Sequence, residues 1–343
     1  MSDGFDLAGL PVPERNYSPW YQWMRRLAAT THEDPLPEGD PDAFPAWLAR
    51  RRARLADVLG PMPDRVPPNL ETLESVQCDG YRRDKIVFDS EDTMSVPAYL
   101  LVPDQRTQAG PAVLACHGHG PGKSQAVGLE HTDAPNSDYA LQLVNQGYVV
   151  MAPDLRCFGE RQDWNPEDHY ACDTNLVHAV MAGQNPLAHN VWDLQRCLDV
   201  LGDHPLVDPS RLGMVGLSYG GTVTLFTAAV DERVAVAVVS GYFSSWAESH
   251  KMPWNMCGSQ VAFGMLGRLE HEDLGALIAP RPLLIESGTE DYLFPVAAAT
   301  ESVRRTRLVY DAEGASDRLV HDVFEGEHQW HGSEAVGFLA RCL

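Results

Sequence analysis

The sequence comprises 343 residues, of which 44% are hydrophobic and 22% charged, the balance of a globular chain long enough to bury a sizeable core. Acidic residues outnumber basic ones 48 to 26, and the net charge of -22 argues against a nucleic-acid partner and an anionic membrane surface. At about 150 residues per domain, the length predicts two domains or one large unit with an appendage.

The sequence carries no signature of a membrane anchor or a secretion signal. Its longest apolar runs, such as 234–240, fall far short of the roughly 18 residues that a membrane-spanning helix needs. Residues 1–6 are acidic and precede no apolar stretch of the signal-peptide kind. The seven cysteines are odd in number and form no Cys-x-x-Cys pair, which favours a reduced chain. We therefore expect a cytoplasmic protein.

The first 75 residues differ in composition from the rest, with dense proline and a cluster of aromatic residues that includes Trp20, Tyr21 and Trp23. Residues 44–59 have the apolar spacing of a helix bounded by Pro45 and Gly60. The arginines of this helix are expected to face mostly outward: Arg50, Arg51, Arg52 and Arg54. Because the segment has too few apolar residues for its own core, we interpret residues 1–75 as a helical arm or partial lid on a domain spanning 76–343.

From about residue 80 the pattern alternates between apolar strands and helices. Strands are predicted over 86–88, 96–102, 112–116, 148–152, 212–217, 234–239, 283–286 and 319–324. Helices are predicted over 136–146, 188–202, 219–230, 296–309 and 332–341. Strands that are apolar on both faces and separated by helices indicate an α/β fold with a mostly parallel sheet covered on both sides. Residues 241–279 are interpreted as an irregular insertion that carries lid or pocket residues.

The strongest local motif is a Gly-x-Ser-x-Gly pattern formed by Gly216, Ser218 and Gly220, placed between a predicted strand and a predicted helix. A nucleophile at such a sharp turn has a strained backbone and an exposed hydroxyl. Side chains at the flanking positions would collide across the turn, which explains both glycines. The pattern alone arises often by chance, whereas its place between strand and helix favours a nucleophilic serine.

A nucleophilic serine needs a base, and the base needs an orienting carboxylate, in the chain order serine, acid, histidine. The predicted acid is Asp291, in the turn after the strand at 283–286, with the adjacent Glu290 as a rival that faces solvent. The predicted base is His328, after the last strand. We interpret His331 as a surface or supporting group and His321 as a structural histidine within the strand.

Two backbone N–H groups are expected to form an oxyanion hole. One belongs to Tyr219, directly after the nucleophile, and the other to His119, in the loop after the strand at 112–116. The imidazole of His119 is also a candidate pocket group. A rival interpretation treats His117 and His119 as metal ligands, but the sequence offers no further ligands at a familiar spacing, so no metal is expected.

Residues 120–124 superficially resemble the end of a phosphate-binding loop. That loop requires glycine at position 117, where the sequence has His117, and the dinucleotide-binding pattern requires glycine at 123, where it has Lys123. Neither nucleotide-binding motif is therefore present.

Further stretches of residues 75–340 carry a family resemblance: 96–103, 116–120, 154–161, 193–199, 207–211 and 278–284. With the serine motif, they make the chain similar to the α/β-hydrolase superfamily, in the bacterial branch grouped with dienelactone hydrolases and acetyl xylan esterases. The N-terminal helical arm resembles that branch as well.

The resemblance implies an eight-stranded, mostly parallel sheet whose first strands form an antiparallel pair, and hydrolysis of an ester or related acyl bond without a cofactor. It assigns Ser218 as nucleophile, Asp291 as acid, His328 as base, and the amides of Tyr219 and His119 as oxyanion donors. Dienelactone hydrolases themselves use a cysteine nucleophile, so the serine in this chain favours an esterase over a lactone hydrolase.

Substrate-binding residues are expected in loops at the carboxyl ends of the strands. The candidates are Arg156, Phe158, Tyr242, Trp246, Trp254 and Phe294. Core packing is an equally good interpretation of the aromatic ones, and Arg156 has Asp154 or Glu160 as an alternative partner.

The leading hypothesis is a serine esterase acting on a small acylated metabolite or an acetylated sugar by an acyl-enzyme mechanism. The alternatives are a peptidase or amidase of the prolyl-peptidase type and a non-catalytic binding protein with a hydrolase fold. The aromatic arm either caps the pocket or packs against a second subunit of a homo-oligomer, and the sequence does not distinguish the two.

Overall fold

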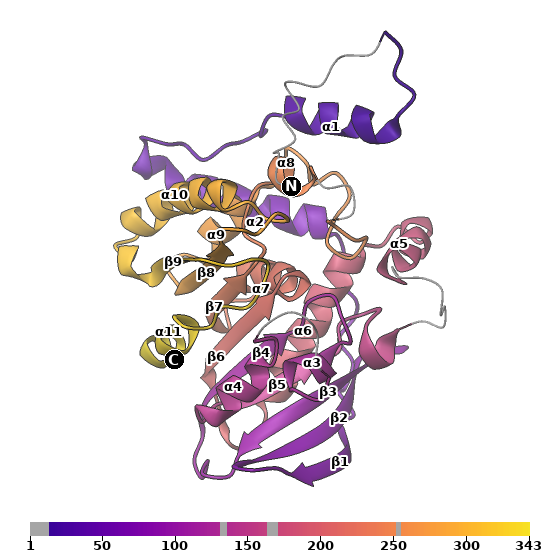
Figure 1. Cartoon of the computed structure of the whole chain (residues 1–343), viewed down its shortest axis with the longest axis vertical. Helices are drawn as coiled ribbons and strands as arrows, with labels where there is room; N and C mark the ends of the chain where they lie inside the picture. Colours follow the sequence, from indigo (N-terminus) through magenta and orange to yellow (C-terminus); the bar gives the residue numbers. More distant parts are fainter. Residues whose placement is uncertain (1–13, 131–135, 163–170, 252–254) are drawn as a thin grey trace.

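A computed structural model describes residues 14–130, 136–162, 171–251 and 255–343 of the chain. Its described residues form one nine-stranded sheet in the order β1-β2-β3-β5-β4-β6-β7-β8-β9 (Figure 1). The strands are β1 (Glu71–Gln77), β2 (Tyr81–Glu91), β3 (Met94–Pro103), β4 (Gly110–Cys116), β5 (Val149–Pro153), β6 (Val207–Leu217), β7 (Val234–Ser240), β8 (Leu283–Gly288) and β9 (Leu319–Phe324). Pairing is antiparallel from β1 through β3 to β5 and parallel from β5 to β9.

The sheet has one strand more than the eight that the family resemblance implies. The additional strand is β1, which pairs only with β2 and is exposed along nearly its whole length. Because an edge strand with both faces in solvent needs no apolar alternation, the sequence of β1 carries no strand pattern.

Helices cover both faces of the sheet. They are α1 (Pro19–Ala29), α2 (Phe44–Leu59), α3 (Lys123–Ala126), α4 (Tyr139–Asn145), α5 (Ala171–Met181), α6 (Pro186–Gly202), α7 (Tyr219–Val230), α8 (Trp246–Ser249), α9 (His271–Ile278), α10 (Val296–Ala312) and α11 (Ala335–Cys342). Short 3₁₀ turns occur at Pro41–Ala43, Gly159–Arg161 and Ser316–Arg318. Within the described part of the chain, no helix is both long and apolar enough to cross a bilayer.

Alternate residues of the central strands contribute to two separate apolar cores, one on each face of the sheet. Ala112, Leu114 and Cys116 of β4 face the core that α2, α6, α7, α9 and α10 cover. Val113 and Ala115 face the core that α3, α4 and α11 cover. Because both faces are buried, these strands read as continuous apolar runs in the sequence, as predicted.

The helix α2 has the bounds expected from its sequence, but one of its arginines does not face outward. Arg51 is 2% exposed and donates hydrogen bonds to the Asp34 carboxylate at 2.6 Å and to the carbonyl of Arg268 at 2.9 Å. A buried guanidinium is tolerated here because a carboxylate and a carbonyl replace its water. The exposed arm helix α1 lies at the end of the molecule far from β1, against α8 (Figure 1).

Candidate active site

Ser218 lies between β6 and α7 in a conformation that few non-glycine residues adopt, with φ of 59° and ψ of -117°. Its N–H donates to the carbonyl of Ser240 at 2.9 Å, and its carbonyl accepts from the N–H of Thr222 at 2.9 Å. The neighbouring strand β7 and the helix α7 therefore hold the strained residue from both sides.

The two glycines of the motif are required by close backbone contacts. A Cβ atom on Gly216 would lie 2.2 Å from the carbonyl oxygen of Gly220, and one on Gly220 would lie 1.9 Å from that of Cys116. Real side chains do not approach backbone this closely. The sharp turn that presents Ser218 thus needs glycine at both positions.

The register of the parallel strands brings distant segments to one edge of the sheet. Leu217 pairs with Ser240, which pairs with Glu286, so β6, β7 and β8 end side by side. A Cβ on Gly241 would lie 3.0 Å from Cε1 of His328 and 3.3 Å from Cδ1 of Leu217. The imidazole of His328 is therefore packed close to the residue that precedes Ser218.

His328, which is partly exposed, pairs with the buried Asp291 at this edge. Nδ1 of His328 lies 2.8 Å from Oδ2 of Asp291, whose side chain is 1% exposed. The other carboxylate oxygen accepts the N–H groups of Leu293 and Phe294 at 2.9 and 3.0 Å. The ring of Phe294 stacks on the imidazole with centroids 5.7 Å apart. These contacts fix both the carboxylate and the ring plane.

The pair also sets the tautomer of His328. An ionised carboxylate only accepts hydrogen bonds, so Nδ1 carries the proton and Nε2 is left with its lone pair. Nε2 is buried and has no hydrogen-bond partner among the described residues. A basic nitrogen without a hydrogen-bond partner can accept a proton, as a general base does.

Ser218 and His328 line one cavity of about 750 Å³. Its wall includes the carboxamides of Gln125, Gln162 and Asn255, the aromatic rings of Phe158 and Tyr292, and His119, Cys157, Cys172, Cys257 and Leu293. Among the described lining residues there is no lysine, arginine, aspartate or glutamate. The described wall thus combines polar and apolar groups and carries no permanent charge.

The two histidines of the loop after β4 differ in burial and in hydrogen bonding. His117 is buried: Nε2 accepts the N–H of Leu155 at 3.0 Å, and Nδ1 lies 2.7 Å from the carbonyl of Gly118. Burial lowers the pKa of His117, and with both nitrogens bound it has no atom left for a metal. His119, by contrast, is exposed and lines the cavity, with its ring against Phe158 and Tyr219.

The backbone around His119 lies close to Ser218. A Cβ on Gly118 would lie 3.3 Å from Cβ of Ser218 and 3.0 Å from the carbonyl oxygen of Leu217. Tyr219 is the first residue of α7, and the first N–H groups of a helix have no partner within it. Both expected oxyanion donors therefore belong to segments that flank Ser218.

Glu286 is a buried carboxyl that the sequence analysis did not single out. Located at the end of β8 and 0% exposed, it accepts the N–H of Gly332 at 2.8 Å and that of His331 at 3.3 Å. Burial raises the pKa of this carboxyl. Glu286 therefore anchors the segment that follows His328. In the sequence, the feature that could have identified it is a single glutamate in an otherwise apolar strand.

The two other histidines near the chain's end lie outside the cavity wall. Nδ1 of His331 is 2.6 Å from Oδ2 of Asp322, and the ring of His331 stacks on Phe324. Nε2 of His321 is 3.0 Å from the hydroxyl of Ser287. Both side chains therefore have partners of their own.

The expected substrate contacts divide into two groups. Phe158 lines the cavity. Tyr242, Trp246 and Phe294 do not line it and are at most 3% exposed, packed in the core beside it. Trp254 lies outside the described residues.

Arg156 is buried and does not line the cavity either. Its guanidinium binds the Asp193 carboxylate at 2.8 and 2.9 Å and also pairs with Glu91. The suggested alternative partners, Asp154 and Glu160, bind Lys123 instead. Arg156 is thus occupied by carboxylates of the chain itself.

Two cysteines of the cavity wall, Cys172 and Cys257, carried no sequence signal because they are 85 positions apart in the chain and form no spaced motif. The thiol of Cys257 donates a hydrogen bond that, together with the nearby His119, lowers the pKa of Cys172. Tyr292 and Leu293 were also missed, since each is an ordinary turn residue next to Asp291.

Comparisons with known sequences place the chain in a family. A family profile described as "Abhydrolase family" matches residues 32–256. The chain is 30% identical over 310 residues to "Putative hydrolase YtaP" of Bacillus subtilis, covering 86% of this chain and 99% of that protein. It is 25% identical over 214 residues to "Polyketide transferase claH" of Penicillium crustosum, covering 60% of this chain and 63% of that protein.

Solved structures share the fold at low sequence identity. A "putative acetyl xylan esterase" from Bacteroides fragilis has a TM-score of 0.74 at 19% identity, covering 92% of this chain and 84% of that one. A glucuronoyl esterase from Solibacter usitatus has a TM-score of 0.63 at 15% identity, covering 91% and 94%. These likenesses establish the three-dimensional arrangement of the chain.

Proposed function

Because this chain belongs to the Abhydrolase family and has the α/β-hydrolase fold, we propose that it is a serine esterase that cleaves a small, uncharged carboxylic ester. The observation that carries the proposal is the meeting of three features at one cavity. They are the strained Ser218, the unpaired Nε2 of His328, and the Asp291 carboxylate bound to the opposite ring nitrogen.

The proposed reaction has two acyl-transfer steps. His328 accepts the Ser218 proton through Nε2 as the serine oxygen attacks the ester carbonyl, and it then protonates the departing alcohol. Water, deprotonated by the same nitrogen, attacks the acyl-enzyme and releases the acid. Asp291 holds the tautomer and stabilises the imidazolium that forms in each step.

The negative oxygen of each tetrahedral intermediate needs donors fixed in advance. We assign this role to the backbone N–H groups of Tyr219 and His119. Donors of this kind lower the barrier by about 3–4 kcal/mol each when they are held in place before the reaction. The helix dipole of α7 adds a partial positive charge beside the same oxygen.

The described cavity wall supports an uncharged, hydrogen-bonding substrate. The carboxamide of Gln162 and the amide oxygen of Asn255 suit hydroxyl groups, as in an acetylated sugar or another small acylated metabolite. The amide nitrogen of Asn255 already donates to the carbonyls of Ser249 and Leu293. A free amino terminus, which an aminopeptidase must hold, would need a carboxylate partner that the described wall does not supply. The similar structures named as esterases are consistent with this assignment.

A substrate panel tests the proposal. Short-chain p-nitrophenyl esters, acetylated xylose and amino-acid p-nitroanilides are offered to the wild-type protein and to Ser218→Ala. We expect turnover of the neutral esters by the wild type only. Anilide turnover that equals ester turnover would instead support a peptidase, and absence of any turnover would support a binding protein.

A further inference from the structure

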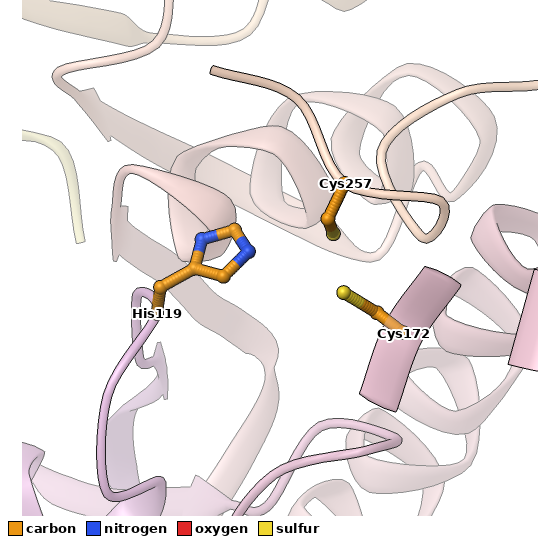
Figure 2. Close-up of side chains that lie close together, drawn as sticks. All are labelled: His119, Cys172 and Cys257. Carbon is orange, nitrogen blue, oxygen red and sulfur yellow. The ribbon is translucent and has the colours of Figure 1, made fainter. Parts of the chain in front are cut away.

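A second group of side chains with defined chemistry lies in the wall of the same cavity. His119, Cys172 and Cys257 each offer one ligand atom, and these atoms all lie within 4.8 Å of one another. Figure 2 shows the two sulfur atoms directed toward each other, with one ring nitrogen of His119 facing them. The three come from the loop after β4, the start of α5 and the segment after α8.

The separations suit a tetrahedral cation. Zinc–sulfur bonds of about 2.3 Å and zinc–nitrogen bonds of about 2.0 Å place neighbouring ligand atoms about 3.5–3.8 Å apart. A contraction of about 1 Å, within the reach of side-chain rotation, would bring atoms that now lie at most 4.8 Å apart to those distances. Two cysteines and a histidine form a donor set that zinc uses when its fourth position holds water or substrate.

The surrounding contacts hold the two cysteine segments together. Asp173, next to Cys172, accepts the N–H of Gly258, next to Cys257, at 2.6 Å. A Cβ on Gly258 would lie 2.8 Å from the carbonyl oxygen of Cys172, so only glycine permits this approach. The N–H of Cys257 donates to Gln260 at 3.2 Å. One hydrogen bond and one close backbone approach therefore hold the two cysteine segments side by side.

The location of this pair differs from that of the two cysteines in the main core. Cys116 and Cys197 are 0% exposed and sit in the main apolar core. Cys172 and Cys257 are 2% and 3% exposed, yet both contribute to the cavity wall beside the exposed imidazole of His119.

We propose that His119, Cys172 and Cys257 bind a thiophilic divalent cation of the zinc class, with an open coordination position toward the cavity that contains Ser218. The cation takes no part in the serine mechanism. Because it occupies cavity space and fixes the loop of His119, it lowers ester turnover. That last effect rests on the proposed function, whereas cation binding itself does not.

Cobalt(II) is the direct probe, because cobalt–thiolate bonds give a charge-transfer absorption band that free cobalt lacks. Chelator-treated, fully reduced protein is titrated with Co²⁺ without oxygen, and free thiols are counted beforehand. We expect one equivalent bound with a thiolate band, displaced by one equivalent of Zn²⁺. No band with all thiols reduced would overturn the proposal, and a Cys172–Cys257 disulfide formed in air would then point to a redox pair.

Variants locate the site. We expect the band to be lost in Cys172→Ser and in Cys257→Ser, and retained in Cys78→Ser, a change at a cysteine outside the cavity. His119→Ala changes an exposed residue, so folding is preserved while cobalt binds more weakly. Circular dichroism verifies that each variant is folded. A band that persists in the Cys172→Ser, Cys257→Ser double variant would overturn the assignment.

Ser218→Ala separates the two proposals, because it removes the nucleophile and leaves the three ligands. We expect it to bind cobalt like the wild type, whether or not the chain proves to be an esterase. In the wild type, we expect Zn²⁺ to lower ester turnover and a chelator to restore it. In Cys172→Ser, we expect Zn²⁺ to have no such effect. Unchanged turnover at saturating Zn²⁺ would overturn the inhibitory effect.

Discussion

Nδ1 of His328 lies 2.8 Å from Oδ2 of Asp291, and the second oxygen of that carboxylate is held by two backbone N–H groups. The turn after β8 thus positions Asp291. Asp291 in turn orients the ring of His328, which belongs to the segment after β9. Since Asp291 is almost wholly buried, the pair is screened little by solvent. The contact leaves Nε2 of His328 as the nitrogen that accepts the Ser218 proton in the proposed mechanism.

Asp291→Asn is expected to lower kcat for ester hydrolysis by about 10⁴-fold, because an amide that donates to Nδ1 stabilises the wrong tautomer. Its remaining carbonyl can still accept the N–H groups of Leu293 and Phe294, so the melting temperature should change little. Glu290→Gln, at the exposed neighbouring position, serves as the control and should leave kcat unchanged. Steady-state kinetics of both variants measures the effect. An equal loss of kcat in Asp291→Asn and Glu290→Gln would contradict the assignment of Asp291 as the acid.

His328 and His331 are both close to the end of the chain, but only His328 lines the cavity. We expect His328→Ala to reduce kcat by about 10⁶-fold, as for removal of a catalytic base. His331→Gln should retain kcat, with a loss of about 1 kcal/mol in the free energy of unfolding from its contact with Asp322. Activity retained by the first variant and lost by the second would reverse the roles.

Gly220→Ala tests the packing of the serine turn. The new Cβ would meet the carbonyl oxygen of Cys116 at 1.9 Å, so the backbone must move and the free energy of unfolding should fall by about 1–3 kcal/mol or more. Gly202→Ala is the matched control, because its Cβ would have only an ordinary contact with Pro209 at 3.5 Å. Urea denaturation compares the two. Equal stability of both variants would mean that the turn tolerates a side chain.

The buried carboxylate of Asp193 predicts a pH dependence of stability. Burial alone would raise its pKa, but the guanidiniums of Arg161 and Arg156 overcome this and hold the pKa of Asp193 below its ordinary value. With a depressed folded pKa, the stabilisation is full above the unfolded value of about 3.9 and is lost as the pH falls below it.

We therefore expect Asp193→Asn to cost about 3–5 kcal/mol of unfolding free energy at pH 7. The gap between the variant and the wild type should narrow as the pH falls from about 5 toward 3. Asp203→Asn, at an exposed position after the same helix, provides the control with no such gap. Urea denaturation at several pH values measures the difference in unfolding free energy between each variant and the wild type. A difference for Asp193→Asn that grows in acid would refute the ion-pair explanation.

The sequence predicted the α/β arrangement because the central strands are buried on both faces, so their apolar runs are unmistakable. It also located α2 and α7 at their observed bounds, since Pro45, Gly60 and the serine turn mark their ends. The exposed strand β1 and the helix α5 were missed, because neither buries a continuous apolar face: Val177, Val180 and Met181 of α5 are exposed. The short helices α3 and α8 and the buried helix α9 were missed as well, and α8 and α9 lie within residues 241–279, which were interpreted as irregular. The first three residues of α9 are His271, Glu272 and Asp273, so its sequence does not look like a buried helix.

Side-chain partners between distant segments were beyond sequence reasoning. Arg51 and Arg156 are charged residues that the fold buries against carboxylates, and no local pattern indicates that Asp34 or Asp193 will be there. The approach of Cys172 to Cys257 likewise depends on how the segment after α8 folds back on α5. By contrast, the residues proposed as nucleophile, acid and base follow strand ends, where parallel topology brings them to one edge.

The most direct test of the account is covalent labelling by a serine-reactive fluorophosphonate, with the modified peptide identified by mass spectrometry. We predict one adduct per chain, on Ser218, that is absent in Ser218→Ala and forms far more slowly in His328→Ala. Ester turnover by a protein that carries no adduct at Ser218, or an adduct that persists in Ser218→Ala, would contradict the account.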